Sequence, residues 1–187
     1  MQGGESRMDW MEEIREKARR KNAILIAKDG VCLEPLRQRL EGQDHRAVVL
    51  WALELAQEGV EGLEAAYPGE DRPRMALAAS WLWARGREKM RGAQRAILDC
   101  HAAAKEMEDP AHIALCHGVG QACAVVHTPG HALGFPMYEL TALVRQYGLE
   151  HCREAVEARR QQYLDRLTYW QTHWQEDPGP WAAFLCR

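Results

Sequence analysis

The sequence predicts an all-α protein, a single compact bundle of about seven or eight helices. Three observations lead to this fold class. Ala and Leu, which favour helices, are abundant, whereas Phe, Ile and Thr, which favour strands, are scarce. Few segments show the alternation of apolar and polar residues that is typical of a strand. Capping residues and prolines that mark helix starts recur along the whole chain.

The first predicted helix begins near Ser6 and Asp9, whose spacing of three residues resembles a capping box. It continues to about Lys28, because Asp29-Gly30 supplies a stop. The following residues, 32–42, form a loop with one helical turn. This part of the chain has the weakest helical pattern.

The second and third helices carry clearer signals. Asp44 caps the second helix, whose apolar residues recur at steps of three and four until Pro68-Gly69 ends it. Asp71 caps the third helix, with Pro73 in the first turn, where a missing N–H group costs nothing. Gly86 and a second glycine at position 92 bracket the break that follows.

The fourth helix covers residues 93–104. Asp109-Pro110 is the plainest start signal in the chain, because a capping residue is followed by proline at the first helical position. The fifth helix therefore begins there and reaches about His127. Thr128-Pro129 repeats the same device for a short sixth segment.

Two helices remain in the C-terminal part of the chain. One covers residues 137–146 and closes at Gly148, and the other is long and charged, from about 149 to 174. Pro178-Gly179-Pro180 ends it before a short apolar tail. No linker rich in Gly or Ser divides the chain, so we expect one all-helical domain over residues 1–187.

The charge balance limits the classes of partner. The chain has 24 Lys and Arg against 27 Asp and Glu, a net charge of −3, which argues against a nucleic-acid-binding protein. No stretch approaches the roughly 20 apolar residues that a membrane span requires. Since residues 1–6 also lack the pattern of a signal peptide, we expect a cytoplasmic protein.

The cysteines show no metal-binding or disulfide pattern. There is no C-x-x-C pair, and such scattered residues are usually buried free thiols. The six are Cys32, Cys100, Cys116, Cys123, Cys152 and Cys186. We therefore expect no disulfide framework.

Histidines concentrate between residues 100 and 138, so a metal site has to be considered as an alternative. His127 and His131 have the spacing of helical metal ligands, but Pro129-Gly130 lies between them. With His101 and His117 they would form the ligand set of a small helical metalloprotein or metal-dependent enzyme. The opposing interpretation is that these histidines are packed in the fold or face a partner, and that no cofactor is bound.

Other catalytic templates are absent: the chain has no G-x-S-x-G elbow and no phosphate-binding loop. Gly118 and Gly120 lie in a predicted helix and more plausibly permit a close approach between helices. Arg72 and Arg74 either pair with nearby acids or grip a carboxylate on a partner. The sequence therefore favours a protein that is not an enzyme.

Several short motifs, in their order and spacing, resemble the Imm-5-like immunity proteins of bacterial polymorphic toxin systems. The resemblance covers about residues 44–147. It is carried by Asp71-Arg72-Pro73-Arg74-Met75-Ala76-Leu77, Trp81, Gly86, Cys100-His101-Ala102-Ala103, Gly120-Gln121-Ala122, Val125-Val126-His127, His131-Ala132-Leu133-Gly134 and Tyr138. Cys116-His117 and Thr128-Pro129-Gly130 depart from the usual Ala-rich pattern, which leaves the geometry of His127 relative to His131 open.

This resemblance implies an all-helical cytoplasmic protein that binds and neutralises a toxin and has no catalytic activity. The motif residues that could project this function are Arg72, Arg74, His101, His127, His131 and Tyr138. Burial of several of them at a junction of helices is the competing interpretation.

Overall fold

A computed structural model describes residues 9–187, and in this range it contains eight α-helices and no strand. The all-α prediction and the number of helices are therefore confirmed. In chain order the helices are α1 (Trp10–Arg19), α2 (Glu34–Leu40), α3 (His45–Ala66), α4 (Arg72–Ala84), α5 (Met90–Ala104), α6 (Pro110–Ala124), α7 (Gly134–Tyr147) and α8 (Arg153–His173). Three short 3₁₀ turns complete the structure: η1 (Pro129–His131), η2 (Trp174–Glu176) and η3 (Ala183–Cys186).

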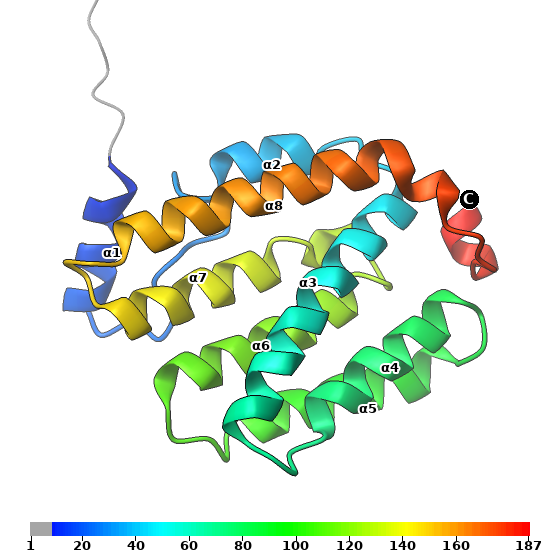
Figure 1. Cartoon of the computed structure of the whole chain (residues 1–187), viewed down its shortest axis with the longest axis horizontal. Coiled ribbons are helices and arrows are strands. Elements are labelled where there is room, and N and C mark those ends of the chain that lie inside the picture. Colours follow the sequence, from blue (N-terminus) through cyan, green and yellow to red (C-terminus); the bar gives the residue numbers. More distant parts are fainter. Residues whose placement is uncertain (1–8) are drawn as a thin grey trace, which may run out of the picture.

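Helix α6 lies at the centre of the arrangement and packs against α3, α4, α5 and α7. Figure 1 shows α4 and α5 paired along one edge, and α8 running beside α2 along the opposite edge. Helix α3 crosses between these two edges and contacts α4, α6 and α8. Residues that are far apart in sequence therefore meet around α6 and α3.

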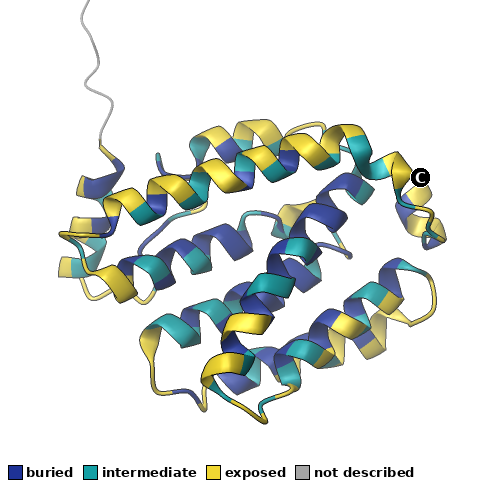
Figure 2. Ribbon diagram, in the orientation of Figure 1, coloured by how far each residue is buried: buried dark blue, intermediate teal, exposed yellow. Residues whose placement is uncertain are grey.

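One connected set of buried side chains draws on all eight helices. Figure 2 shows that α3, α6 and α7 are largely buried, whereas α8 exposes a whole face. Trp51 of α3 is fully buried, and its indole N–H donates to the carbonyl of Tyr163 in α8 at 3.0 Å. This hydrogen bond satisfies the polar atom of a large buried aromatic side chain and ties α8 to the core.

Three predicted helix starts, at Asp44, Asp109 and Thr128, are confirmed by their hydrogen bonds, whereas Asp9, which the predicted capping box placed inside the first helix, instead caps α1. The carboxylate of Asp109 accepts from the N–H groups of Ala111 and His112 at 2.7 and 3.1 Å. Side chains of the same kind cap α1, α3 and η1, namely Asp9, Asp44 and Thr128. These contacts satisfy N–H groups that the helix itself leaves without a partner.

The predicted end of the first helix is wrong, because α1 stops at Arg19 rather than near Lys28. Lys21 adopts a left-handed conformation with φ of 57°, and its N–H donates to the carbonyl of Ala18, while that of Asn22 donates to Lys17. This is the helix-ending motif that glycine usually forms, so a lysine there gave no signal. Ser6, the other half of the predicted capping box, lies outside the described residues.

Helical continuation of α1 would also remove two contacts of the next segment. The N–H groups of Leu25 and Ile26 both donate to the hydroxyl of Thr141 in α7, at 3.1 and 3.2 Å. Both residues are buried in the core. The chain gains more by laying this segment against α7 than by extending an exposed helix.

Three further predictions of helix boundaries need correction. Asp71 makes no capping hydrogen bond, and the carboxylate of Glu70 accepts the N–H of Arg72 instead. Gly92 lies inside α5 rather than in the break before it. The long C-terminal helix covers Arg153–His173 rather than 149–174, because Gly148 to Cys152 form a turn closed by hydrogen bonds to the Gly148 carbonyl.

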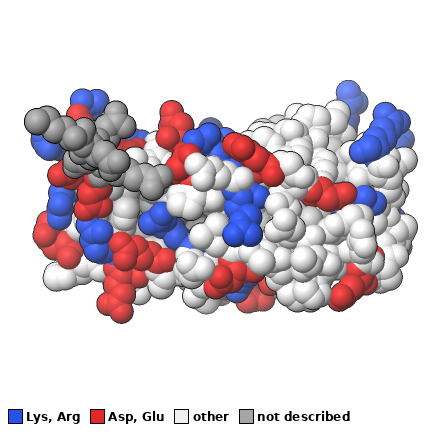
Figure 3. Space-filling view, turned by 90° about the horizontal axis from the view of Figure 1, so that it is seen from above, with Lys and Arg blue, Asp and Glu red and all other residues white. Residues whose placement is uncertain are grey.

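Charges of both signs alternate on the face that Figure 3 shows, mainly at the end near α1. Arg159 of α8 forms two ion pairs with other helices, with Glu139 of α7 at 2.8 Å and with Glu58 of α3 at 2.9 Å. No helix within residues 9–187 combines the length and the apolar character that crossing a membrane would require.

Candidate functional site

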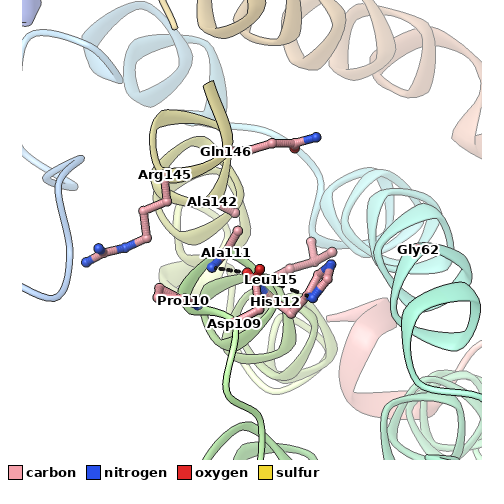
Figure 4. Close-up of a pocket in the computed structure, with 9 residues that line it drawn as sticks. All are labelled: Gly62, Asp109, Pro110, Ala111, His112, Leu115, Ala142, Arg145 and Gln146. Carbon is pink, nitrogen blue, oxygen red and sulfur yellow. Dashed lines mark hydrogen bonds and ion pairs between the residues drawn. The ribbon is translucent and has the colours of Figure 1, made fainter. Parts of the chain in front are cut away.

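Among the described residues, three cavities bear on function: a larger one, a smaller one and a third that adjoins the smaller one. In the larger cavity, the side chains of Asp109 and Arg145 are already hydrogen-bonded. This cavity measures about 720 Å³ and lies between α3, the start of α6 and the end of α7. Figure 4 shows Asp109 engaged in capping α6 and the Arg145 side chain extending away from the other labelled residues. The Arg145 guanidinium donates to the carbonyl of Ala23 at 2.7 Å. None of the predicted functional residues lines this cavity.

The smaller cavity gathers three of the predicted residues. It measures about 320 Å³, within the range of ligand pockets, and its walls come from α4, α5, α6 and η1. His101, His127 and His131 all line it. The remaining lining residues are apolar side chains and two amides: Trp83, Met90, Gln94, Ile97, Leu98, Gln121 and Ala124.

A third cavity of about 400 Å³ adjoins the smaller one, since Trp83, Met90 and His127 line both. Phe184 and Arg187 of the C-terminal tail contribute to its wall, together with His45. We call these two adjoining cavities the histidine groove. It lies where α4, α5 and the C-terminal tail meet.

Contacts with α4 hold the tail in place at the groove. The Arg85 guanidinium forms two hydrogen bonds with the Asp177 carboxylate, at 2.6 and 2.8 Å, and lies 4.5 Å from the ring centre of Trp181. The N–H of Ala182 donates to the carbonyl of Ala84 at 2.8 Å. These contacts bring the ring of Phe184 to 5.7 Å from Trp83.

Two of the histidines form a direct pair. The Nδ1 atoms of His101 and His117 are 2.9 Å apart, so one ring donates the hydrogen and the other accepts it. His117 in turn packs against the ring of Tyr138, with 5.5 Å between ring centres. The structure therefore brings together His101, His117 and Tyr138 at the junction of α5, α6 and α7, with only His101 reaching the groove.

His127 and His131, which also line the smaller cavity, are held by separate contacts. His127 is exposed and stacks on Trp83, with ring centres 6.1 Å apart and planes 20° from parallel. His131 donates from Nδ1 to the side-chain oxygen of Gln121 at 3.2 Å. The turn η1 separates the two rings, so their spacing of four residues does not translate into one helical face.

Arg72 and Arg74 are not part of the groove. Arg72 forms ion pairs with Glu70 and Glu106, and Arg74 forms two hydrogen bonds with Glu64 at 2.8 and 2.7 Å. These pairs fix the start of α4 to its neighbours. The sequence left open whether these arginines pair with nearby acids or grip a carboxylate on a partner. In the structure they pair with nearby acids.

The surroundings of His101, His117 and His131 disfavour protonation of their rings. Burial is the main cause that lowers the pKa values of His101, His117 and His131. The nearby ammonium groups of Lys105 and Lys28 further lower the pKa values of His117 and His131. These rings are therefore neutral near pH 7 and act as hydrogen-bonding groups.

The donor groups for a metal ion are not assembled in the described part of the chain. Within residues 9–187, no three side chains of His, Cys, Asp or Glu are placed to hold one ion. His101 and His117 bond to each other, whereas His127 and His131 have separate contacts with Trp83 and Gln121. The geometry thus does not match the ligand set considered from the sequence.

Sequence reasoning missed the apolar part of the groove. On α5, Met90, Gln94, Leu98 and His101 recur at steps of four and three, which places them on one helical face. Two of them, Met90 and Leu98, are 52% and 60% exposed. This periodicity is the signal of the groove in the sequence. It does not identify a groove, because an apolar helix face predicts core packing unless the neighbouring helices are known.

Comparison with known families gives one match over most of the chain. The model for the Imm-5 like putative immunity protein family matches residues 38–166. No curated protein and no solved structure matches the chain. The matched range includes α3 to α7 and all the histidines that line the smaller cavity.

Proposed function

This chain belongs to the Imm-5 like immunity protein family, and from that premise we propose that it binds a cognate bacterial toxin and neutralises it without catalysis. The family match over residues 38–166 is the observation that carries the proposal. The setting that we propose is the cytoplasm of a bacterium. The partner is a protein rather than a nucleic acid, and no cofactor takes part.

The surroundings of the buried thiols Cys32, Cys100 and Cys123 disfavour covalent chemistry at these positions. Burial raises the pKa values of Cys32 and Cys123 to about 12. Cys100 also has a raised pKa, because its thiol is hydrogen-bonded to Cys116 and buried. Thiols in such surroundings are poor nucleophiles. A compact helical protein with exposed apolar side chains beside a groove fits a binding role better.

The test is co-expression with the toxin encoded beside this gene. Bacteria that carry the toxin alone are expected to stop growing, and bacteria that also carry this chain are expected to grow. Purified chain and a catalytically inactivated toxin should form a complex in calorimetry or size-exclusion chromatography. If the toxin neither associates with this chain nor loses toxicity, the proposed function is wrong.

A further inference from the structure

We infer that the histidine groove receives an apolar side chain of the toxin, and that carboxylates on the toxin flank this side chain and meet a basic rim on α5. The inference rests on the proposed function and specifies which surface performs it. No feature of the family match assigns a binding surface. Three properties of the groove support this occupant: its exposed apolar residues, the uncharged walls of its smaller cavity and the unpaired cations beside it.

Three large apolar side chains at the groove are exposed to solvent. Leu98 and Met90 are 60% and 52% exposed, and Phe184 is 38% exposed. Together with the stacked rings of Trp83 and His127 they surround a space large enough for one or two side chains. Contiguous apolar surface next to a pocket is typical of a protein interface, and a buried anchor in such a pocket carries much of the binding energy.

Among residues 9–187, those that line the smaller cavity include no Asp, Glu, Lys or Arg. Its polar groups are the amides of Gln94 and Gln121 and the rings of three histidines, and burial lowers the pKa values of two of these rings, His101 and His131. A charged side chain that entered this cavity would lose its hydration without gaining an opposite charge. The walls therefore select an uncharged side chain as the anchor.

The rim beside the groove is basic, although the whole chain has a net charge of −3. Arg87, Lys89, Arg91 and Arg95 are all exposed, and none forms an ion pair within residues 9–187. Arg91 and Arg95 follow Met90 and Gln94 by one position, so they lie about 100° further round the helix, on its solvent side.

The acidic groups on this stretch do not neutralise the rim. Glu88 accepts the N–H of Lys89 and Asp99 lies further along the helix, which leaves four cations against two carboxylates between residues 87 and 99. The N-terminal end of α5 adds the positive end of its helix dipole. Unpaired cations of this kind attract an acidic partner surface and speed its association.

The apolar half of the inference is tested with a matched pair of variants. Leu98 lines the groove and Met75 of α4 does not, and both are exposed apolar residues on a helix, at 60% and 56%. Leu98→Ser is expected to raise the Kd for the inactivated toxin roughly tenfold or more. Met75→Ser is expected to leave the Kd within about twofold of the wild-type value.

The electrostatic half is tested by reversing charges. R91E/R95E reverses two exposed arginines one helical turn apart on α5, and R15E/R19E does the same on α1, outside the family match. R91E/R95E is expected to slow association with the toxin roughly tenfold at low salt, with a smaller difference at high salt. R15E/R19E is expected to associate at nearly the wild-type rate. Circular dichroism and thermal melting establish that each variant is folded.

The outcomes separate this inference from the proposed function. If the wild-type chain protects cells, and Leu98→Ser and R91E/R95E bind the toxin as tightly and as fast as the wild type, the groove is not the binding surface. The proposed function would still stand. Weakened binding by Leu98→Ser with unchanged association of R91E/R95E would overturn the basic rim. A wild-type chain that neither binds nor protects overturns the proposed function itself.

Discussion

At the scale of single residues, a glycine decides whether the histidine pair can form. A side chain at position 120 would place its Cβ only 2.6 Å from the ring of His101, a separation that no real contact allows. Gly118 likewise lets Tyr138 approach, since a Cβ there would lie 3.2 Å from that of Tyr138. The expectation that these glycines permit close helix approach is thus confirmed by the contacts.

The histidine pair should make the fold sensitive to acid. His101 and His117 share one hydrogen between their Nδ1 atoms, so the folded state cannot hold a proton on both atoms of the pair. Their folded pKa values are lowered, which means that the unfolded chain binds more protons once the pH falls below about 6.5. Stability is therefore fully present above that pH and decreases as the pH falls towards the lowered pKa values.

We expect the melting temperature to fall between pH 7 and pH 5 by less in His101→Gln than in the wild type, because the variant lacks one of the buried bases. The matched control is His151→Gln, since His151 is exposed and its side chain forms no hydrogen bond with the described residues. Thermal melts at the two pH values measure the difference. Equal losses in His101→Gln and the wild type would contradict the role of the pair.

At the scale of helices, capping hydrogen bonds separate two starts that look alike in sequence. Asp109-Pro110 and Asp71 with Pro73 both place an acid before a proline in the first turn. Asp109 is in an extended conformation and caps α6, whereas Asp71 is already helical and cannot turn its carboxylate to the N–H groups. The carboxylate that accepts the first N–H of α4, that of Arg72, belongs to Glu70.

Asp109→Ala is therefore expected to lower the free energy of unfolding by about 1 kcal/mol, because two N–H groups lose their acceptor. Asp71→Ala is the control and should change it by less than about 0.5 kcal/mol. Chemical denaturation of both variants gives the two values. Equal changes in the free energy of unfolding for the two variants would contradict a stabilising role of the capping contact of Asp109.

At the scale of the whole molecule, the long helix α8 is bound to the rest through its inner face alone. Tyr163 and Leu167 are fully buried, the Trp51 indole donates to the Tyr163 carbonyl, and Arg159 pairs with acids from α7 and α3. The exposed face of α8 is polar and cannot stabilise the helix by itself. Helix α8 therefore depends on the core that it covers.

We predict that residues 9–187 unfold as one cooperative unit, in agreement with the single domain expected from the sequence. Denaturant curves followed by tryptophan fluorescence and by far-ultraviolet circular dichroism should coincide, because the tryptophans report on packing and the circular dichroism on all helices. Two separated transitions would instead show that α8 or the α4–α5 edge is an independent unit.

The sequence by itself determined the features that depend on neighbours within a few residues. The helical class and the starts at Asp44 and Asp109 follow from propensity, capping and proline, which act over one turn of the chain. The family resemblance also rested on short motifs, and the match over residues 38–166 agrees with it. The concentration of histidines between residues 100 and 138 is visible in the sequence, but their contacts are not.

Only the tertiary structure decided which of those residues meet. The end of α1 depends on Thr141, more than a hundred residues away, and the pair of His101 with His117 depends on how α5 crosses α6. The groove exists because the tail brings Phe184 next to Trp83 while α5 turns Leu98 and Met90 to the same side. Local preferences determine most helix starts, but helix packing depends on apolar surfaces from distant parts of the chain, which no short stretch of sequence encodes.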